Sequence, residues 1–369
     1  MRKLRREERY YFWLSQIMGD KYRTFDKLMK IYGSAENIFN EANGNKPSFP
    51  KFINEHTKKE MQRAARDEFI DKYEAIMEKK KIGITTLISE DYPFLLKEIN
   101  MPPRVLFYIG NLIEPKLPIA VVGTRSCTDY GEKVSGKLGF ELASSGVCVI
   151  SGMALGIDAS AARGALRAEN NDFPTVAVLG SGLNIIYPKE NEKLFYEIAE
   201  RGLVISEYTL GVKPMPGNFP MRNRVIVGLS KGVVIVEAPQ KSGALISAGL
   251  ALDYNRDLFC VPGRITDHMS IGVNKLMVEG AGKPINSVSD ILLEYNIKVK
   301  ASKTTIRYNE RGLPKEALAI CKELEKENKT YDDLCEILGL SHLDLNSALT
   351  YLEFSGIIKQ LPGREYCFV

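Results

Sequence analysis

Short, wholly apolar runs recur through the middle of the chain, between residues 118 and 293. Each run holds three to five residues without polar alternation, as strands of a parallel sheet covered on both faces require. The runs lie at residues 119–122, 147–150, 175–179, 203–205, 233–236 and 258–261. The segments between them, such as 132–144 and 159–168, have the length and periodicity of helices. The pattern predicts an α/β fold with a doubly wound parallel sheet, whose ligands bind beyond the carboxyl ends of the strands.

Residues 1–80 follow a different period. Their apolar positions recur at helical spacing, and a second helical run, dense in charges of both signs, covers residues 58–81. Short β-rich stretches follow at 84–88 and 104–109. We therefore expect a small helical module in front of an α/β domain that covers residues 81–297.

The end of the chain forms a separate unit in this interpretation. Residues 298–310 are polar, lysine-rich and weakly periodic, which is typical of a linker. Residues 311–369 contain three helical segments, which begin at Pro314, at a capping box from Thr330 to Asp333, and at Ser341. A hairpin pattern follows them. Three helices and a hairpin predict a winged-helix domain.

The composition is that of an ordinary globular protein. The 369 residues are 44% hydrophobic, enough for two or three domains with their own cores. The 50 Lys and Arg residues outnumber the 46 Asp and Glu residues by four, an excess too small to indicate a polyanionic partner by itself. The six cysteines form no C-x-x-C pair, which favours a reducing, cytoplasmic setting. No apolar stretch approaches the ~20 residues that span a bilayer, and we expect neither a signal peptide nor membrane attachment.

The first strand of the α/β domain ends in a loop suited to an anion. Its residues Gly123, Thr124 and Arg125 do not fit the dinucleotide pattern G-x-G-x-x-G, because the arginine stands in place of the second glycine. A strand-to-helix turn with free backbone N–H groups and a guanidinium group would suit a phosphate. On this motif alone, Arg125 as a solvated surface residue is an equal alternative.

Three further strand ends carry small residues, and we expect all four loops to open on one edge of the sheet. Backbone donors can approach a ligand closely at such residues, and a lysine adds positive charge. The residues are Ser151, Gly152, Gly180, Lys241, Ser242 and Gly243. The alternative for each glycine is an ordinary tight turn.

An unusual stretch opens the helix that covers residues 219–227. It places Phe219, Arg222, Asn223 and Arg224 at a helix N-terminus, where acidic residues are normally favoured. The arrangement makes sense if the helix end and both guanidinium groups face a polyanion while the aromatic ring stacks on a base. Alternatively, Phe219 anchors the helix in the core and one arginine pairs with Glu207.

Signals for catalysis are weak. The three histidines lie in three different modules without ligand partners nearby in the sequence, and the chain lacks the P-loop and G-x-S-x-G motifs. Asp158 is interpreted as the N-cap of a helix rather than as a catalytic acid. We expect no metal, no cofactor and no enzymatic activity.

Seven ordered motifs lie at residues 120–125, 150–158, 187–191, 205–207, 219–224, 241–246 and 261–263. Together they resemble the DNA-processing protein A family, also called DprA or Smf. The resemblance implies an extended Rossmann-like domain, a sterile-alpha-motif-like module in front and a winged helix behind. It also implies a homodimer that binds and protects incoming single-stranded DNA and loads the RecA recombinase onto it during natural transformation.

The resemblance also implies roles for individual residues. Arg125 would be the main phosphate ligand and Phe219 the residue that stacks on a base. The other residues expected to line the pocket are Gly123, Thr124, Ser151, Gly152, Gly180, Lys213, Arg222, Asn223, Arg224, Lys241, Ser242 and Gly243. The sequence departs from the family pattern twice: Ala162 stands where many members have histidine, and Met215 and Pro216 stand where some have lysine, so that Lys213 is the nearest cation.

Two other functions remain as alternatives. A nucleotide hydrolase of the lysine-decarboxylase-like (LOG) group shares this sheet, but Ser247 stands where that group has its catalytic glutamate, which removes the acid-base group. A winged helix can also bind duplex DNA in a sequence-specific manner. The predicted recognition helix, 342–353, contains two acids and no lysine or arginine, so we expect it to contact protein instead.

Overall fold

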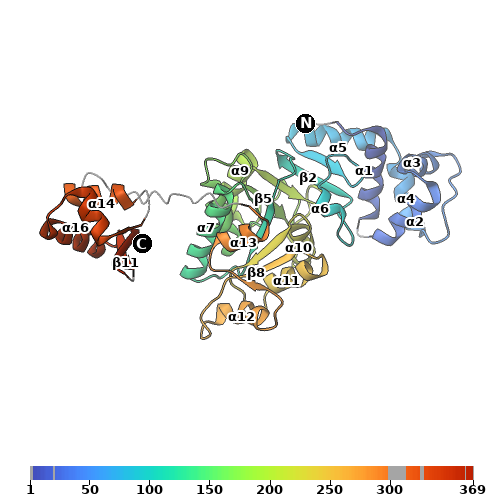
Figure 1. Ribbon diagram of the computed structural model, residues 1–369. Coiled ribbons are helices and arrows are strands. Elements are labelled where there is room, and N and C mark those ends of the chain that lie inside the picture. The colour runs from blue at the N-terminus through green and yellow to red at the C-terminus, as the bar shows by residue number, and fades with distance from the viewer. Residues whose placement is uncertain (1–2, 20, 298–312, 325–327, 362, 369) are drawn as a thin grey trace. The chain divides into compact units, whose positions relative to one another are not determined.

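A nine-stranded sheet is the frame of residues 1–297 in the computed structural model (Figure 1). Its order is β1-β2-β6-β5-β4-β3-β7-β8-β9; β1 and β2 pair in antiparallel fashion at one edge, and the strands from β6 to β9 run parallel. The strand bounds are β1 Gly83–Thr86, β2 Val105–Gly110, β3 Pro118–Val122, β4 Cys148–Ser151, β5 Thr175–Leu179, β6 Leu203–Ser206, β7 Gly232–Ile235, β8 Asp257–Cys260 and β9 Lys283–Pro284. Every strand predicted from the apolar runs is present.

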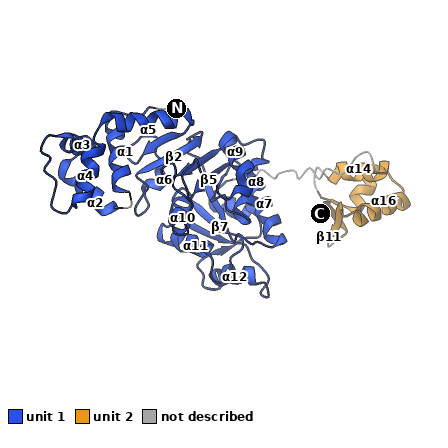
Figure 2. Cartoon of the chain, turned by 180° about the vertical axis from the view of Figure 1, so that it is seen from behind, with its two compact units in different colours: residues 1–297 blue, residues 298–369 orange. Residues whose placement is uncertain are grey.

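The structure describes residues 3–19, 21–297, 313–324, 328–361 and 363–368. The chain divides into two units, residues 1–297 and 298–369 (Figure 2). The predicted linker at 298–310 lies outside the described residues, and the proposed domain boundaries stay a prediction.

Helices cover both faces of the sheet because successive strand residues point to opposite sides. In β3, Ile119 and Val121 join a core with α7, α8 and α13, whereas Ala120 and Val122 join a core with α6, α10 and α11. This arrangement confirms the predicted doubly wound fold. The helices of the α/β region are α6 Phe94–Lys97, α7 Asp129–Ser144, α8 Ile157–Leu166, α9 Glu192–Arg201, α10 Asn218–Gly228, α11 Gly243–Asp253, α12 Ile271–Val278 and α13 Val288–Glu294. Two short 3-10 turns, η1 Lys189–Asn191 and η2 His268–Ser270, lie between them.

Five N-terminal helices continue the core beyond the antiparallel edge of the sheet. They are α1 Arg6–Met18, α2 Tyr22–Tyr32, α3 Ala35–Asn43, α4 Glu55–Ala64 and α5 Asp67–Lys79. Phe12 of α1 lies edge-on to Phe107 of β2, with 6.2 Å between ring centroids. The predicted single run over residues 58–81 is wrong. It contains two helices, because the backbone at Ala65 and Arg66 leaves the helical region.

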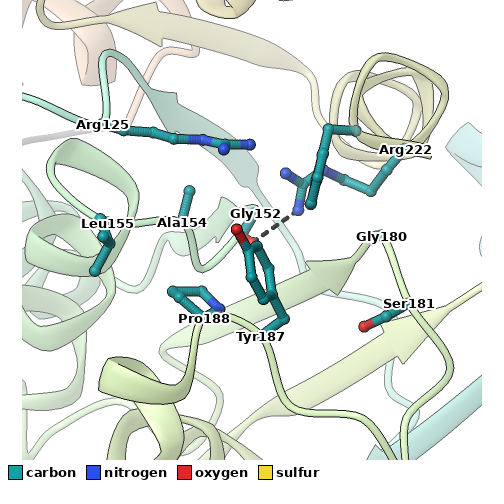
Figure 3. A pocket seen from close by; sticks show the side chains of 10 residues that line it. Arg125, Gly152, Ala154, Leu155, Gly180, Ser181, Tyr187, Pro188 and Arg222 are labelled. Atoms are coloured by element: carbon teal, nitrogen blue, oxygen red, sulfur yellow. Dashed lines mark hydrogen bonds between the residues drawn. The ribbon is translucent and has the colours of Figure 1, made fainter. Parts of the chain in front are cut away.

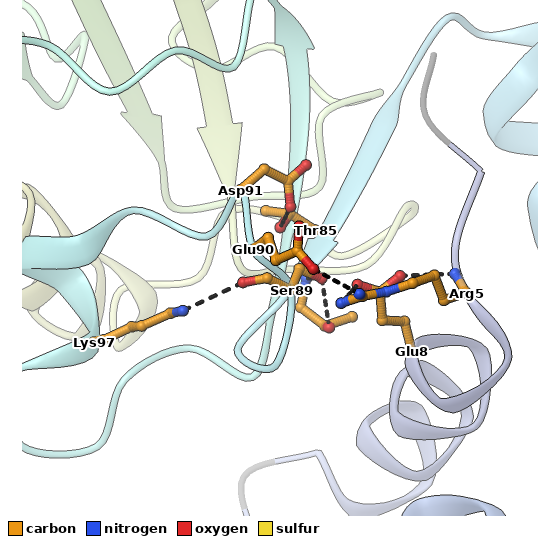
Figure 4. A network of polar contacts seen from close by, with 8 residues as sticks. Arg5, Glu8, Thr85, Ser89, Glu90, Asp91 and Lys97 are labelled. Atoms are coloured by element: carbon orange, nitrogen blue, oxygen red, sulfur yellow. Dashed lines mark hydrogen bonds and ion pairs between the residues drawn. The ribbon is translucent and has the colours of Figure 1, made fainter.

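A polar network fastens α1 to the loop that follows β1 (Figure 4). The Arg5 guanidinium forms ion pairs with Glu8 at 3.2 Å and with Glu90 at 2.7 Å. The Glu8 carboxylate is buried and also accepts the backbone N–H of Arg5 at 2.7 Å, which satisfies a free donor at the helix start. The same loop is closed by Ser89, whose hydroxyl accepts the N–H of Thr86 at 3.0 Å.

The described residues of the second unit form three helices and a three-stranded sheet of order β10-β12-β11. Its elements are α14 Lys315–Leu324, β10 Lys329–Thr330, α15 Tyr331–Leu338, α16 His342–Phe354, β11 Ile358–Leu361 and β12 Glu365–Phe368. Thr330 and Asp333 form the predicted capping box, and Ser341 is the N-cap of α16. The winged-helix prediction is confirmed.

Nowhere in the described part of the chain is a helix both long and apolar enough to cross a membrane. The same residues contain no cluster of three or more His, Cys, Asp or Glu side chains that could hold a metal ion.

Helices α7 and α8 approach each other closely through glycine. A Cβ atom added at Gly139 would lie 2.0 Å from the Ala161 carbonyl oxygen, and one added at Gly164 would lie 2.1 Å from the Gly136 carbonyl oxygen. Both obstacles are backbone atoms, so the helices could accept a side chain only by moving apart.

We expect Gly139→Ala to lower the free energy of unfolding by about 1–3 kcal/mol, because overpacking forces the two helices apart. Gly249 of α11 is the matched control, since it is helical, exposed and has nothing within 4 Å of its ideal Cβ position. Gly249→Ala should instead stabilise the chain by about 0.5–1 kcal/mol through the lower chain entropy of alanine. Urea unfolding of both variants measures the difference, and equal effects would contradict the close-packing argument.

Candidate nucleic-acid interface

The direction of winding changes between β3 and β7. From β3 the chain passes through β4 and β5 to β6 on one side, and then returns to place β7 on the other side of β3. The loops that follow these two strands diverge, and doubly wound sheets bind ligands in the crevice this leaves. The loops after β3, β4, β5 and β7 meet there, which confirms the expectation that they open on one edge.

A groove of about 630 Å³ lies at this point, and we call it the switch-point groove. A smaller recess adjoins it and shares Arg125, Tyr187, Phe219 and Arg222. The predicted residues that line one or both are Gly123, Thr124, Arg125, Gly152, Gly180, Phe219, Arg222, Asn223, Lys241, Ser242 and Gly243.

Phe219 lines the recess and lies at the start of α10. Its ring is half-buried, with the guanidinium carbon of Arg125 at 4.7 Å and that of Arg222 at 6.0 Å from the ring centroid. The ring of Tyr187 lies beside it at 5.7 Å, tilted by 35°. Figure 3 shows the two arginines pointing toward one another across the recess, next to Tyr187. Phe219 therefore does not anchor the helix in the core, and its ring remains accessible.

Arg222 is a buried cation that joins two strand ends. Its Nη1 donates to the carbonyl oxygens of Gly152 at 2.7 Å and Val178 at 2.5 Å, and its Nε donates to Asn223 at 3.2 Å. A Cβ atom at position 152 would lie 2.4 Å from Nη1 of this guanidinium, so a side chain there would require the guanidinium to move. Burial lowers the pKa of Arg222, and the nearby carboxylate of Asp158 raises it.

Asp158 is not the N-cap of α8, which is Gly156, and that prediction is wrong. The aspartate lies in the first turn and is buried, with Oδ2 accepting the backbone N–H of Gly152 at 2.9 Å. Burial raises the pKa of this carboxyl group, whereas the Arg222 charge and N–H groups of the two loops, including that of Gly123, lower it. Asp158 thus holds the loops after β3 and β4 against each other.

A second buried carboxylate shapes the loop that carries Arg125. Glu237, which follows β7, accepts the backbone N–H of Thr128 at 2.9 Å and its hydroxyl at 2.5 Å. The carbonyl oxygen of Glu237 accepts the N–H of Thr124 at 2.8 Å. The contacts of Glu237 with Thr124 and with Thr128 fix the two ends of a short turn. The exposed side chain of Arg125 projects from it.

The loop after β7 contributes a second exposed cation, Lys241. The next residue, Ser242, is the N-cap of α11, and its hydroxyl accepts the N–H of Ala244 at 3.2 Å. The side-chain amide of Asn223 donates to the carbonyl oxygen of Gly243 at 3.3 Å, which ties this loop to α10.

Three predicted residues do not line the groove. Arg224 is buried on another face of α10, where it pairs with Glu207 and donates to the hydroxyl of Tyr22 at 2.9 Å. The alternative that one arginine pairs with Glu207 is therefore correct. Ser151 is fully buried, and its hydroxyl donates to the Asp158 carbonyl oxygen at 3.3 Å. Lys213 is exposed in the segment that leads to α10, outside the lining residues.

Three residues of the site were missed in the sequence. Asp158 and Glu237 organise its loops, and Tyr187 lies against Phe219. The signal for Asp158 is an acid inside the first turn of an otherwise apolar helix, a position that favours contact with free backbone N–H groups.

Comparison with known proteins places these features in a family. The model for DNA recombination-mediator protein A matches residues 83–296, and the model for the DprA winged helix domain matches residues 309–364. Protein Smf of Synechocystis is 37% identical over 311 residues, which cover 75% of this chain and 77% of that protein. DNA processing protein DprA of Streptococcus pneumoniae is 40% identical over 227 residues, 61% of this chain and 79% of that protein.

Solved structures agree with these sequence matches. The crystal structure of DprA from Streptococcus pneumoniae has a TM-score of 0.65 at 32% identity and covers 79% of this chain and 99% of its own. A structure of DNA processing protein A from Helicobacter pylori, described for its single-stranded DNA binding mode, has a TM-score of 0.52 at 33% identity. It covers 57% of this chain and 95% of its own. With its sheet, its winged helix and its motifs all matched, the chain belongs to the DNA recombination-mediator protein A family.

Proposed function

We propose that this chain binds single-stranded DNA in the switch-point groove, through phosphates and stacked bases. The observation that carries the proposal is the half-buried Phe219 ring, whose centroid lies 4.7 Å from the guanidinium carbon of Arg125 and 6.0 Å from that of Arg222. Aromatic stacking joined to a cationic groove is the chemistry by which proteins bind single strands without sequence preference. The Helicobacter pylori relative, whose structure describes single-stranded DNA binding, supports the same ligand for this chain.

Arg125 and Lys241 are suited to phosphate contacts. Both side chains are exposed, and neither forms an ion pair with another of the described residues. The Arg222 guanidinium donates to the carbonyl oxygens of Gly152 and Val178. Its role is therefore to position the Phe219 ring and to add positive charge to the groove. In a duplex both faces of each base are already stacked, and Phe219 would have nothing to bind. The groove therefore favours single strands.

We further infer that the chain forms a homodimer, works in the cytoplasm and hands the protected strand to RecA rather than reacting with it. Membership of the family supports RecA as the partner. Ser247, which is buried in the lining of the groove, offers no acid-base group where LOG hydrolases have glutamate. The winged helix fits a protein contact, since its helix α16 carries no lysine or arginine.

The phosphate role predicts a salt-dependent loss of affinity in Arg125→Ala. One lost phosphate contact should weaken binding of a labelled oligo-dT by about tenfold or more. It should also make the slope of log K against log salt shallower by about 0.7. Fluorescence anisotropy at several salt concentrations, with the matching duplex in parallel, measures both effects.

Arg6→Ala is the control, because it removes an exposed guanidinium of α1 that pairs with Glu36 and does not line the groove. Its affinity and slope should equal those of the parent chain. Equal binding of duplex and single strand, or an unchanged slope in Arg125→Ala, would contradict the proposal.

The stacking role predicts that Phe219→Ala loses about 1–3 kcal/mol of binding, or roughly 5- to 150-fold in affinity, while Phe219→Trp retains it. Phe140→Ala is a matched control. Phe140 is an exposed phenylalanine of α7, also covered by a guanidinium, with Arg167 at 5.7 Å. Anisotropy titration with oligo-dT should separate the variants, and equal losses at both positions would remove Phe219 from the site.

Delivery to RecA predicts that the full chain shortens the lag before RecA assembles on single strands coated with single-strand-binding protein. Arg125→Ala and Phe219→Ala should lose this effect, because the strand is no longer held. RecA-dependent ATP hydrolysis reports the lag. No shortening by the parent chain would refute RecA delivery while leaving strand binding intact, and a monomer in sedimentation would refute the homodimer.

A further inference from the structure

The excess positive charge of the chain lies in its N-terminal helices. Residues 1–82 contain 19 Lys and Arg residues against 13 Asp and Glu residues, whereas residues 83–369 contain 31 against 33. None of residues 1–82 lines the switch-point groove or its recess. A net positive charge on a small helical module indicates contact with a polyanion where the cations gather on one face.

Helix α2 gathers three of these cations on one face. Arg23, Lys27 and Lys30 are spaced four and three residues apart, so their side chains leave the helix on the same side. All three are exposed, and none of these side chains forms an ion pair or a hydrogen bond within the described part of the chain. Asp26 is the only acid of α2 and is also exposed, so three cations stand against one carboxylate. We call Arg23, Lys27 and Lys30 the α2 basic face.

An accessible aromatic ring lies beside this face. Phe52, in the segment between α3 and α4, is 42% exposed, and Nζ of Lys27 lies 5.5 Å from its ring centroid. The acid that follows Phe52 most closely in sequence, Glu55, pairs with Lys58 at 2.7 Å. The face thus joins unpaired cations to a ring on which a base can stack, which is the chemistry of single-strand binding.

The surroundings of Phe140 on α7 show that an exposed ring beside a cation is not enough. There Arg167 covers the ring, but its Nη2 donates to the carbonyl oxygen of Gly136 at 3.4 Å. Lys137 of the same helix pairs with Glu141 at 3.8 Å. The cations near Phe140 therefore have partners in the protein, whereas those of the α2 basic face do not.

The α2 basic face also lies close to the switch-point groove along the chain's surface. A polar cavity of about 480 Å³ is lined by Tyr22, the first residue of α2, and by Val212 and Asn218. Pro216, which lies between the latter two in sequence, lines the groove. The segment 212–218 therefore borders both, and it carries the exposed Lys213. A strand that leaves the groove over this segment would reach the start of α2.

We propose that the α2 basic face binds a further stretch of the single strand that occupies the switch-point groove. Arg23, Lys27 and Lys30 contact its phosphates, and Phe52 stacks on a base. The helical rise of 1.5 Å per residue spreads the three cations over about 10 Å, enough for more than one phosphate. This inference rests on the proposed function, which supplies the strand.

The test compares strands of two lengths on the full chain. An oligo-dT of about 6 nucleotides fits the groove alone, whereas one of about 40 nucleotides covers several such footprints. The triple variant Arg23→Gln, Lys27→Gln, Lys30→Gln should bind the short strand as the parent chain does. It should bind the long strand about tenfold or more weakly, because three charge-assisted contacts are lost. The slope of log K against log salt should become shallower by about 2, at about 0.7 for each phosphate contact.

The matched control is the triple variant Lys72→Gln, Lys79→Gln, Lys80→Gln. It removes the same charge from the same module, at three exposed lysines of α5 and its C-cap without ion pairs among the described residues. Its affinity for the long strand should stay close to that of the parent chain. Equal losses in both triple variants would show a long-range effect of net charge and overturn the proposal. Unchanged binding of the short strand also shows that each variant is folded.

The stacking part is tested by Phe52→Ala. The variant should lose about fivefold or more of the affinity for the long strand and none for the short one. Phe140→Ala is again the control and should change neither. An equal loss in both variants would remove Phe52 from the site.

The two proposals fail in different ways. Failure of the proposed function appears as no binding of the short strand by the parent chain. Failure of the present inference appears as normal binding of the short strand, together with long-strand affinity that the α2 triple variant leaves unchanged. A duplex of the same length serves as the third ligand. If the α2 triple variant weakens duplex binding as much as single-strand binding, the face recognises any nucleic-acid backbone, and its assignment to the single strand is overturned.

Discussion

Two buried charges of opposite sign, Asp158 and Arg222, hold the candidate site in shape. Each is costly to bury alone, and each favours the charged form of the other. Their hydrogen bonds run to the ends of different strands: Arg222 joins the carbonyl oxygens after β4 and at the end of β5, and Asp158 accepts N–H groups from the loop after β4. The pair thereby ties the loop after β4 to the end of β5 and to α10, and the contacts of Glu237 with Thr124 and Thr128 fix the loop after β3.

The pair also explains why the site combines rigid and free cations. The Arg222 guanidinium is held in place by hydrogen bonds to backbone carbonyl oxygens. Arg125, in contrast, projects from a turn that Glu237 fixes at both ends. Asp158 and Glu237 are buried and their carboxylates are directed at backbone N–H groups, whereas the exposed side chains of Arg125 and Lys241 are positive. Positive charge therefore dominates the surface that a phosphate would meet, although the whole chain is nearly neutral.

The sequence was sufficient for the sheet and for much of the groove. Wholly apolar runs predict buried parallel strands, and the carboxyl ends of such strands lie at one edge of the sheet, so the sequence alone predicts that Arg125, Gly180 and Lys241 lie close together. The prediction that Arg222 and Arg224 both face the groove was wrong, and helical geometry gives the reason. Residues two apart point to different sides of a helix, whereas Phe219 and Arg222, three apart, share one.

The remaining features depend on contacts between distant segments. Nothing near Asp158 in the sequence indicates that it would meet Arg222, and Glu237 meets Thr128 only because β7 lies beside β3. The break in the helical run at Ala65 was missed because neither glycine nor proline marks it. Sequence patterns report what a residue does within its own element. They do not indicate which residues from distant segments the sheet topology brings into contact.

The guanidinium of Arg125 covers Phe219 in the unbound protein, on a ring that a base would need. A base that stacks on this face has to displace the arginine, which exchanges a cation–π contact for a phosphate. Part of the gain on binding is thereby cancelled, and the same arginine can return to the ring as the strand leaves. If the site binds a strand as we propose, it contains its own competitor, which favours rapid exchange of the strand over permanent retention.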